Sequence, residues 1–321
     1  MKTLNLVYPE KSDIKYRIDK FPDGQQNIVI EPTPEKLSLD KLSEFFNNIP
    51  SKKDDILIKS RLNNWLDLEL ITCAVASLRE LGVEEIHLYT PYIMGARSDR
   101  KFEEGGNNYL RDVICPVINS LNFKTVTCID PHSDVLEACI KGFRKESNLS
   151  LVNFAIDSIY PKSYDCPQRY RKEGIASYIP LDVNDSFILV SPDAGASKKI
   201  YKLAEQIGYK GDVITCSKDR DIDGKLTMVN VPIAFDAFTS KKADFIIIDD
   251  ICDGGATFIN IAKNLKNRVK GKIYLIVTHG IFSKSFGELS QYFDNIYCTN
   301  SYKDIKGEAS PQYVKQLNVF L

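Results

Sequence analysis

The sequence has no long apolar run and no excess of charge of either sign. Its 42 lysine and arginine residues stand against 43 aspartate and glutamate residues, which gives a formal net charge of −1. This balance provides no broad basic surface for nucleic acid or for an anionic membrane. No apolar run approaches the length that spans a bilayer, and the charged amino terminus is unlike a signal peptide. We therefore expect a soluble cytoplasmic protein with no nucleic-acid partner and no membrane partner.

The sequence also lacks paired cysteines. Its 8 cysteines form no C-x-x-C pair, and most of them lie inside apolar segments. We expect them to be buried thiols in a reducing compartment, because disulfide and metal-binding cysteines usually show regular spacing. Histidine is scarce as well, with 3 residues, so few imidazoles compete for a role in a site.

Alternating strand and helix patterns predict an α/β protein. At 321 residues the chain is longer than an average domain, so we expect two domains, residues 1–157 and 158–321, with an irregular connection at about 158–183. Repeated strand, helix and strand units require a parallel sheet that is covered on both faces, so both domains should be doubly wound. The expected strands are 4–8, 28–30, 56–60, 86–89, 125–129, 187–190, 212–215, 228–231, 245–248 and 273–277, and the expected helices are 68–81, 109–121, 133–142, 198–207 and 257–265.

The segment from 245 to 258 combines an apolar run, three carboxylates and two adjacent glycines. The glycines let backbone N–H groups turn inward, and a helix start with the Thr257 hydroxyl adds donors, so a phosphate fits there. Asp249 and Asp250 follow the predicted strand, at the edge where α/β sheets bind ligands. They suit ribose hydroxyls or a magnesium ion attached to them. An ordinary strand, turn and helix with solvated aspartates is the alternative.

This segment resembles the phosphoribosyl-diphosphate-binding loop of type I phosphoribosyltransferases and ribose-phosphate diphosphokinases. The resemblance implies domains of the type I phosphoribosyltransferase kind. By itself, the segment leaves the reaction open. The ribose 5-phosphate site that it implies consists of Asp249, Asp250, Asp253, Gly254, Gly255, Ala256 and Thr257.

Further segments resemble the ribose-phosphate diphosphokinase family in the same order along the chain, from about residue 17 to 302. Residues 20–25 resemble the family's adenine-contacting turn, which reaches the active site of a neighbouring subunit. Residues 91–101 resemble its ATP-binding loop, in which the guanidinium of Arg97 can stack on adenine and reach phosphate oxygens. Glutamine at position 25 and serine at position 98 depart from the family pattern. The implied ATP site consists of Phe21, Asp23, Gln25, Arg97, Ser98 and Asp99.

Two segments imply a magnesium site. Residues 130–133 resemble a family turn whose histidine helps to hold Mg–ATP, and His132 follows a predicted strand. Residues 190–199 resemble the loop that opens the second domain, where Asp193 would supply an anionic oxygen to magnesium on the ATP phosphates. The resemblance therefore implies Mg²⁺ as the cofactor, with His132 and Asp193 as ligands. A histidine that merely satisfies its hydrogen bonds is the alternative.

The segment 216–225 bears on the reaction itself. It follows a strand, is almost wholly polar, and resembles the family's mobile K-x-R loop. Lys218 and Arg220 stand two positions apart, so in an extended backbone they project to the same side, where they can stabilise charge on a transferred diphosphoryl group. Together with His132 they form the predicted catalytic set. A phosphoribosyltransferase has no need of this pair, and a solvated loop of alternating charge is the alternative.

The ordered set of motifs indicates a ribose-phosphate diphosphokinase, which converts ATP and ribose 5-phosphate into 5-phosphoribosyl 1-diphosphate and AMP. The resemblance also implies a homo-oligomer, at least a dimer. Two alternatives remain, a type I phosphoribosyltransferase and a non-catalytic regulatory paralogue of the synthetase. Residues 102–109 replace a basic stretch that contributes to effector binding in regulated members, and residues 278–283 resemble a turn that closes the site wall.

Overall fold

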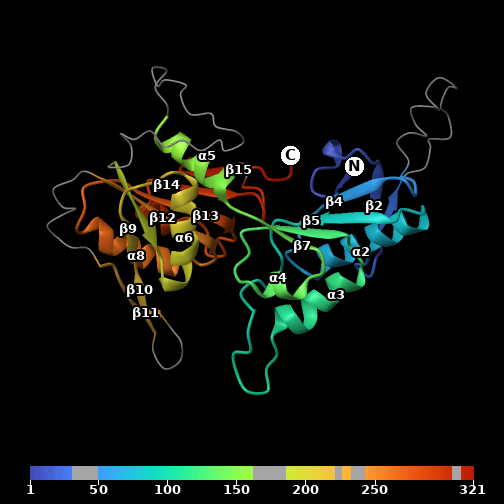
Figure 1. The fold of residues 1–321 in the computed structure, drawn as a ribbon, viewed down its shortest axis with the longest axis horizontal. Coiled ribbons are helices and arrows are strands. Elements are labelled where there is room, and N and C mark those ends of the chain that lie inside the picture. The colour runs from blue at the N-terminus through green and yellow to red at the C-terminus, as the bar shows by residue number, and fades with distance from the viewer. Residues whose placement is uncertain (31–49, 162–185, 221–225, 233–242, 306–311) are drawn as a thin grey trace. The chain divides into compact units, whose positions relative to one another are not determined.

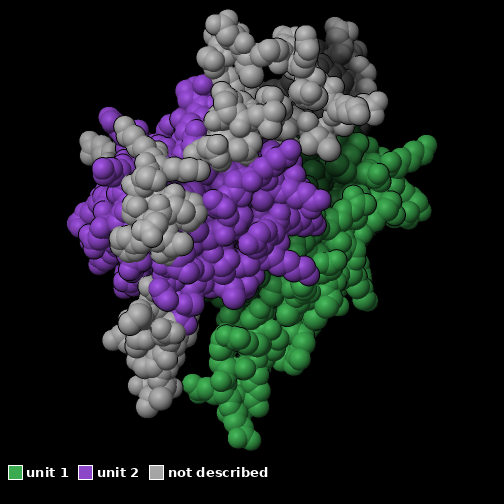
Figure 2. Space-filling model, turned by 60° about the vertical axis from the view of Figure 1, so that its left-hand side comes forward, with its two compact units in different colours: residues 1–146, 319–321 green, residues 147–318 purple. Residues whose placement is uncertain are grey.

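The computed structural model describes residues 1–30, 50–161, 186–220, 226–232, 243–305 and 312–321. Within them, the chain divides into two compact units, residues 1–146 with 319–321 and residues 147–318 (Figures 1 and 2). Each unit contains a parallel sheet, so the predicted α/β class is confirmed. The sequence placed the boundary after residue 157. Helix α5 (Leu149–Ile159) buries its apolar face in the core of the second unit, and the units therefore divide before it.

The first unit is built on five parallel strands in the order β1-β4-β5-β6-β7. A hairpin of two further strands, β2 and β3, packs against helix α2. The strands are β1 (Lys2–Asn5), β2 (Tyr16–Lys20), β3 (Gln26–Ile30), β4 (Asp55–Lys59), β5 (Glu85–Tyr89), β6 (Thr125–Ile129) and β7 (Phe143–Glu146). The helices are η1 (Pro9–Lys11), α2 (Trp65–Glu80), η2 (Leu110–Ile114), α3 (Cys115–Ser120) and α4 (Val135–Cys139).

The first sheet has one apolar face. Alternate residues such as Ile58 and Leu88 are fully buried in a single core with helices α2, α3 and α4. Their neighbours on the opposite face, such as Leu57 and His87, are half-buried. The described strands of this sheet also run in sequential order. The described helices that connect β4 to β5, β5 to β6 and β6 to β7 pack on this one apolar face.

The second unit has the doubly wound arrangement. Its six parallel strands have the order β15-β14-β13-β12-β8-β9, so the order reverses at β8. Helices α5 and α6 share one core cluster on the sheet, and α8 belongs to another. The strands are β8 (Phe187–Ser191), β9 (Val213–Thr215), β12 (Asp244–Cys252), β13 (Ile273–Gly280), β14 (Asn295–Thr299) and β15 (Val314–Leu317), with β10 (Ser217–Arg220) and β11 (Leu226–Asn230) as an antiparallel pair. The other helices are α6 (Ala194–Gln206), α8 (Ala256–Lys266) and η3 (Leu289–Gln291).

Several element boundaries differ from the prediction for identifiable reasons. Strand β12 continues past 248 and β13 past 277, because Asp249 pairs with Val277 and Cys252 with Gly280. Residues 278–280 are therefore strand and not turn. Strand β1 ends at Asn5, whose side-chain oxygen accepts hydrogen bonds from the next backbone N–H groups and turns the chain. Residues 162–185, most of the predicted connection, lie outside the described residues.

The seven described cysteines are free thiols, five of them buried. Burial raises the pKa of Cys216 to about 12, so this thiol stays protonated at neutral pH. Cys166 lies outside the described residues. No described helix combines the length and the apolar character that crossing a membrane requires.

Candidate active site

Acidic residues gather at the carboxyl edge of the second sheet. Strands β8 and β12 are parallel neighbours in which Val190 pairs with Ile247. Asp193 and Asp250 each lie three residues beyond that pair, so both stand where the strands deliver their side chains to the same edge. Ligands of open α/β sheets bind at this edge.

Asp193 makes two strong contacts. Its Oδ1 accepts a hydrogen bond of 2.9 Å from the backbone N–H of Ala196 and so caps helix α6. Its Oδ2 accepts a hydrogen bond of 2.6 Å from Nζ of Lys218. Burial would raise the pKa of Asp193, but the hydrogen bonds from Lys218 and Ala196 outweigh burial, and the pKa is lowered. Lys218, the predicted catalytic lysine, is therefore in direct contact with Asp193, the predicted metal ligand.

Asp249 and Asp250 form a second acidic group beside this pair. The Asp250 side chain is 7 % exposed, and its Oδ2 accepts a hydrogen bond of 2.8 Å from Nζ of Lys199. Burial, and then the charge of Asp250, raises the pKa of Asp249 to about 8. Sequence reasoning did not include Lys199 in the site. The available signal was a lysine early in a helix, where its charge opposes the helix dipole.

The loop from Asp253 to Thr257 leads from β12 into helix α8. Gly255 precedes the helix with φ +79°, and a Cβ there would lie 3.1 Å from the Leu289 side chain, so glycine is required. The N–H groups of the first helical turn have no partner within the helix, which makes this end suitable for an anion. Asp253, Gly254 and Thr257 are half-buried, and Ala256 is exposed.

A cation that the sequence analysis missed lies against this loop. A Cβ built on Gly254 would come within 3.4 Å of the aliphatic carbons of Lys284, so the lysine side chain passes directly over the glycine. No spacing in the sequence could indicate this, because Lys284 follows β13 and not β12.

Strand β10 begins directly after the buried Cys216 and carries Lys218. Lys218 pairs with Val229 of β11, and the register shifts between Asp219 and Arg220. Regular alternation of side chains is lost at such a shift. The premise that Lys218 and Arg220 project to the same side is therefore not supported by the backbone. The side chain of Arg220 and residues 221–225 lie outside the described residues.

The predicted ATP residues lie in the first unit, and several are exposed. Phe21, Asp23 and Gln25 form the exposed turn of the β2–β3 hairpin, where the backbone N–H of Phe21 donates to Gln25 O at 2.9 Å. The Phe21 ring is 51 % exposed, which is unusual for a large apolar side chain.

Arg97 and His132 follow the carboxyl ends of adjacent strands, β5 and β6. Both are exposed, whereas Ser98 and Asp99 are half-buried. The backbone N–H of Ile129 donates to Pro91 O at 3.1 Å, which ties the two loops together. The structure therefore gathers these loops at one edge of the first sheet.

Magnesium fits the donors of the second unit. Mg²⁺ prefers oxygen ligands, and Asp193, Asp249 and Asp250 present carboxyl oxygens at one sheet edge. His132 belongs to the first unit, and Asp193 belongs to the second.

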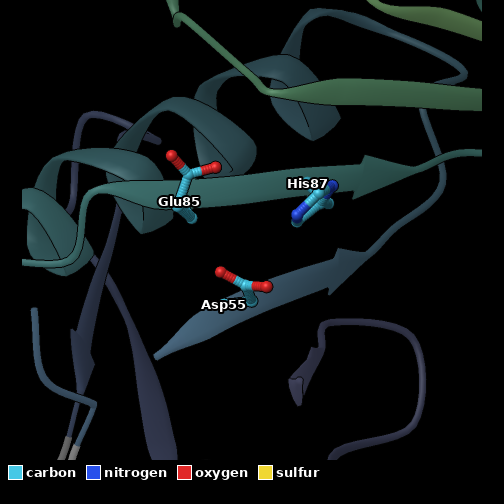
Figure 3. A group of neighbouring side chains, drawn as sticks. All are labelled: Asp55, Glu85 and His87. Carbon is cyan, nitrogen blue, oxygen red and sulfur yellow. The ribbon is translucent and has the colours of Figure 1, made fainter. Parts of the chain in front are cut away.

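A different group of possible metal ligands lies on the first sheet. Asp55, Glu85 and His87 offer ligand atoms within 4.8 Å of one another, from strands β4 and β5 (Figure 3). Asp55 and Glu85 are paired in register, and His87 stands two residues further on the same face. Nζ of Lys124 lies 2.6 Å from Glu85 Oε2, so a lysine already neutralises part of this group. None of these residues was predicted.

Comparisons with known proteins find relatives of this chain by sequence and by structure. A family model described as "Phosphoribosyl synthetase-associated domain" matches residues 190–319. The ribose-phosphate pyrophosphokinase of Mycoplasmopsis pulmonis is 27 % identical over 241 residues, which are 74 % of this chain and 65 % of that protein. The ribose-phosphate pyrophosphokinase of Pyrococcus furiosus is 24 % identical over 294 residues, which are 91 % of this chain and 88 % of that protein.

Among solved structures, the phosphoribosylpyrophosphate synthetase from Mycobacterium smegmatis is similar, with a TM-score of 0.73 and 15 % identity. The match covers 100 % of this chain and 95 % of that one. At this identity, the likeness establishes a shared fold.

Proposed function

Because the chain belongs, as a distant member, to the ribose-phosphate pyrophosphokinase (diphosphokinase) family, we propose that it transfers the diphosphoryl group of ATP to ribose 5-phosphate. The products are 5-phosphoribosyl 1-diphosphate and AMP. The observation that carries the proposal is Lys218, held 2.6 Å from Asp193 beside the buried acids of the second sheet. A cation at this place serves phosphoryl transfer, because the transition state spreads negative charge over the transferred group.

In the proposed reaction, the C1 hydroxyl oxygen of ribose 5-phosphate bonds to the β-phosphorus of ATP. The bond from that phosphorus to the oxygen of the α-phosphate breaks, AMP leaves, and the hydroxyl proton passes to water. The 5-phosphate lies against the N–H groups of residues 254–257, where helix α8 begins. Asp249 and Asp250 receive the ribose hydroxyls and fix the sugar for attack.

We assign charge stabilisation to residues of the second unit and ATP binding to residues of the first. Lys218 and Arg220 stabilise charge on the transferred group, and Arg97, Ser98 and Asp99 bind ATP together with His132. Mg²⁺, which the acidic edge of the second sheet would hold, supplies charge neutralisation on the phosphates when it is bound. The substrates are therefore two phosphorylated small molecules, and a cytoplasmic location belongs to the same proposal.

The test is to incubate the purified protein with ATP, Mg²⁺ and ribose 5-phosphate and to measure AMP and the sugar together. One AMP should form for each ribose 5-phosphate consumed. A type I phosphoribosyltransferase would instead consume 5-phosphoribosyl 1-diphosphate with a nucleobase and release diphosphate. A regulatory paralogue would do neither, so the two incubations separate the three possibilities.

We also propose a homo-oligomer in which the β2–β3 turn completes a neighbouring subunit's ATP site. The support is a group of exposed apolar side chains on the hairpin and the adjoining start of α2, where Gln26 Nε2 donates to Leu66 O at 3.2 Å. They are Ile18, Phe21, Trp65 and Leu66. Exposed apolar groups of this kind commonly mark an interface.

Mixing two inactive variants tests this assembly. Asp23→Ala and Lys218→Ala would damage different subunits' contributions to the same composite site. In a mixed dimer one site then carries both lesions and the other is intact, so activity should return on subunit exchange. If the turn serves its own subunit, every site keeps one lesion and the mixture stays inactive.

A further inference from the structure

Lys199 of helix α6 contacts the acidic edge of the second sheet through Asp250, yet none of the sequence motifs assigns it a role. Its ammonium group is 2.8 Å from Asp250 Oδ2, and the lysine side chain is 35 % exposed where the aspartate is 7 % exposed. A carboxylate this buried is strongly disfavoured unless a cation or hydrogen-bond donors accompany it. Lys199 therefore allows Asp250 to remain charged at this position.

The backbone holds both partners of this ion pair in place. Helix α6 is fixed at its start by the Asp193 cap, and Ala196, Ile200 and Leu203 bury its apolar face. Lys199 follows Ala196 by three residues and precedes Leu203 by four, so it flanks that buried face. Asp250 lies within β12, between pairings with β13 on either side. The pair thus joins a packed helix to a central strand.

We propose that Lys199 is a positioning residue for the sugar, which holds the Asp250 carboxylate in the orientation that receives the ribose hydroxyls. This role rests on the proposed function, because it requires ribose 5-phosphate to bind at this edge. It differs from the role of Lys218, which lies on the β10–β11 pair and is proposed to act on the transferred group. Lys199 acts through Asp250 and not on the reacting atoms.

The test is calorimetry with ribose 5-phosphate on the unaltered protein and on Lys199→Met, Lys199→Arg and Lys202→Met. Loss of a charged hydrogen bond should weaken binding of the sugar phosphate about tenfold or more in Lys199→Met. Lys199→Arg should stay within about threefold of the unaltered protein, because it keeps a charged donor. Lys202→Met is the matched control from an exposed position of the same helix and should bind normally. The ATP dissociation constant should be the same in all four proteins.

A double-mutant cycle separates this role from simple stabilisation of the fold. If Lys199 acts through Asp250, adding Lys199→Met to Asp250→Asn should cause little further loss of sugar affinity. Multiplicative losses, or normal binding by Lys199→Met, would overturn the positioning role. Should Lys199→Met fail to fold, as thermal denaturation would reveal, Lys199→Gln takes its place with the same expected loss. If the unaltered protein does not bind ribose 5-phosphate, the proposed function fails, and the positioning role fails with it.

Discussion

The two sheets of this protein differ in how they bury their faces. Because of this difference, the candidate ligand residues are more buried in one unit and more exposed in the other. The second sheet has an apolar core on both sides, and its strand β13 is buried along its whole length. The first sheet is apolar on one side and half-buried on the other. A sheet enclosed on both faces can hold charged groups such as Asp250 in a fixed, dry environment. The predicted ATP residues of the first unit instead include several that lie on exposed loops.

Replacing one phenylalanine in each sheet by alanine tests this difference in burial. Of the predictions made here, it should give the largest change in free energy. Phe245 in β12 is 1 % exposed, whereas Phe143 in the edge strand β7 is half-buried. Phe245→Ala should cost about 3–5 kcal/mol of unfolding free energy, and Phe143→Ala about 1–1.5 kcal/mol. Urea denaturation followed by circular dichroism measures both, and Trp65, the single tryptophan, reports on the first unit by fluorescence. Equal losses would contradict the contrast between the sheets.

The next largest effect is expected on catalysis, when a substitution of Lys218 in the second unit is compared with one of Arg97 in the first. Lys218→Ala should lower turnover roughly 100–1000-fold, equivalent to about 3–4 kcal/mol, because it removes a fixed cation from the transition state. Binding of ribose 5-phosphate should change little. The exposed Arg97 of the first unit should matter less, so Arg97→Ala should mainly raise the KM for ATP. Steady-state kinetics with both substrates decides this. An effect of Lys218→Ala confined to KM would refute its assignment.

The pattern of burial explains which parts of this structure the sequence could predict. Strands β8, β12 and β13 carry continuous apolar runs, and their existence was predicted although two of their ends were not. The ends depend on pairing between strands, as between Cys252 and Gly280, which no single segment reveals. Strand β7 has the sequence Phe-Arg-Lys-Glu and was missed, because an edge strand with exposed charges has no apolar pattern.

In the candidate site, too, the sequence could predict some residues and not others. Short motifs identified Asp193, Lys218 and the acids of β12, because their chemistry is concentrated in a few consecutive residues. Lys199 and Lys284 were missed, since their proximity to the site comes from helix packing and from the path of the chain after β13. Contacts of this kind require the three-dimensional fold.

A third experiment asks whether the units divide the two substrates. Thr257→Val removes a hydroxyl from the proposed phosphate loop and should weaken ribose 5-phosphate by about 1.5–3 kcal/mol, tenfold or more. The ATP affinity should be unchanged, because this loop is proposed to bind only the sugar phosphate. Arg97→Met should show the opposite selectivity. Calorimetry with each ligand alone is sufficient, and comparable losses for both ligands in Thr257→Val would end the proposed division.

The smallest expected effect concerns the acid pair of the second sheet, and it depends on pH. The pKa of Asp249 is raised to about 8 by burial and by the charge of Asp250, against about 3.9 in an unfolded chain. Between these values the folded state binds the proton more tightly. The stabilising contribution of this group is therefore complete below about pH 4 and is lost as the pH rises through about 8. For one proton, the change is at most about 1.4 kcal/mol per pH unit.

Asp249→Asn removes the titrating group and keeps its shape. The variant should lose less stability than the unaltered protein between pH 6.5 and 7.5, with a difference of at most about 1.4 kcal/mol. Its affinity for ribose 5-phosphate should fall, so stability and binding move in opposite directions. Asp212→Asn, at an exposed position of the same unit, should leave the pH profile unchanged. Urea denaturation at several pH values measures these slopes, and parallel profiles for Asp249→Asn and the unaltered protein would show that Asp249 does not titrate in this range.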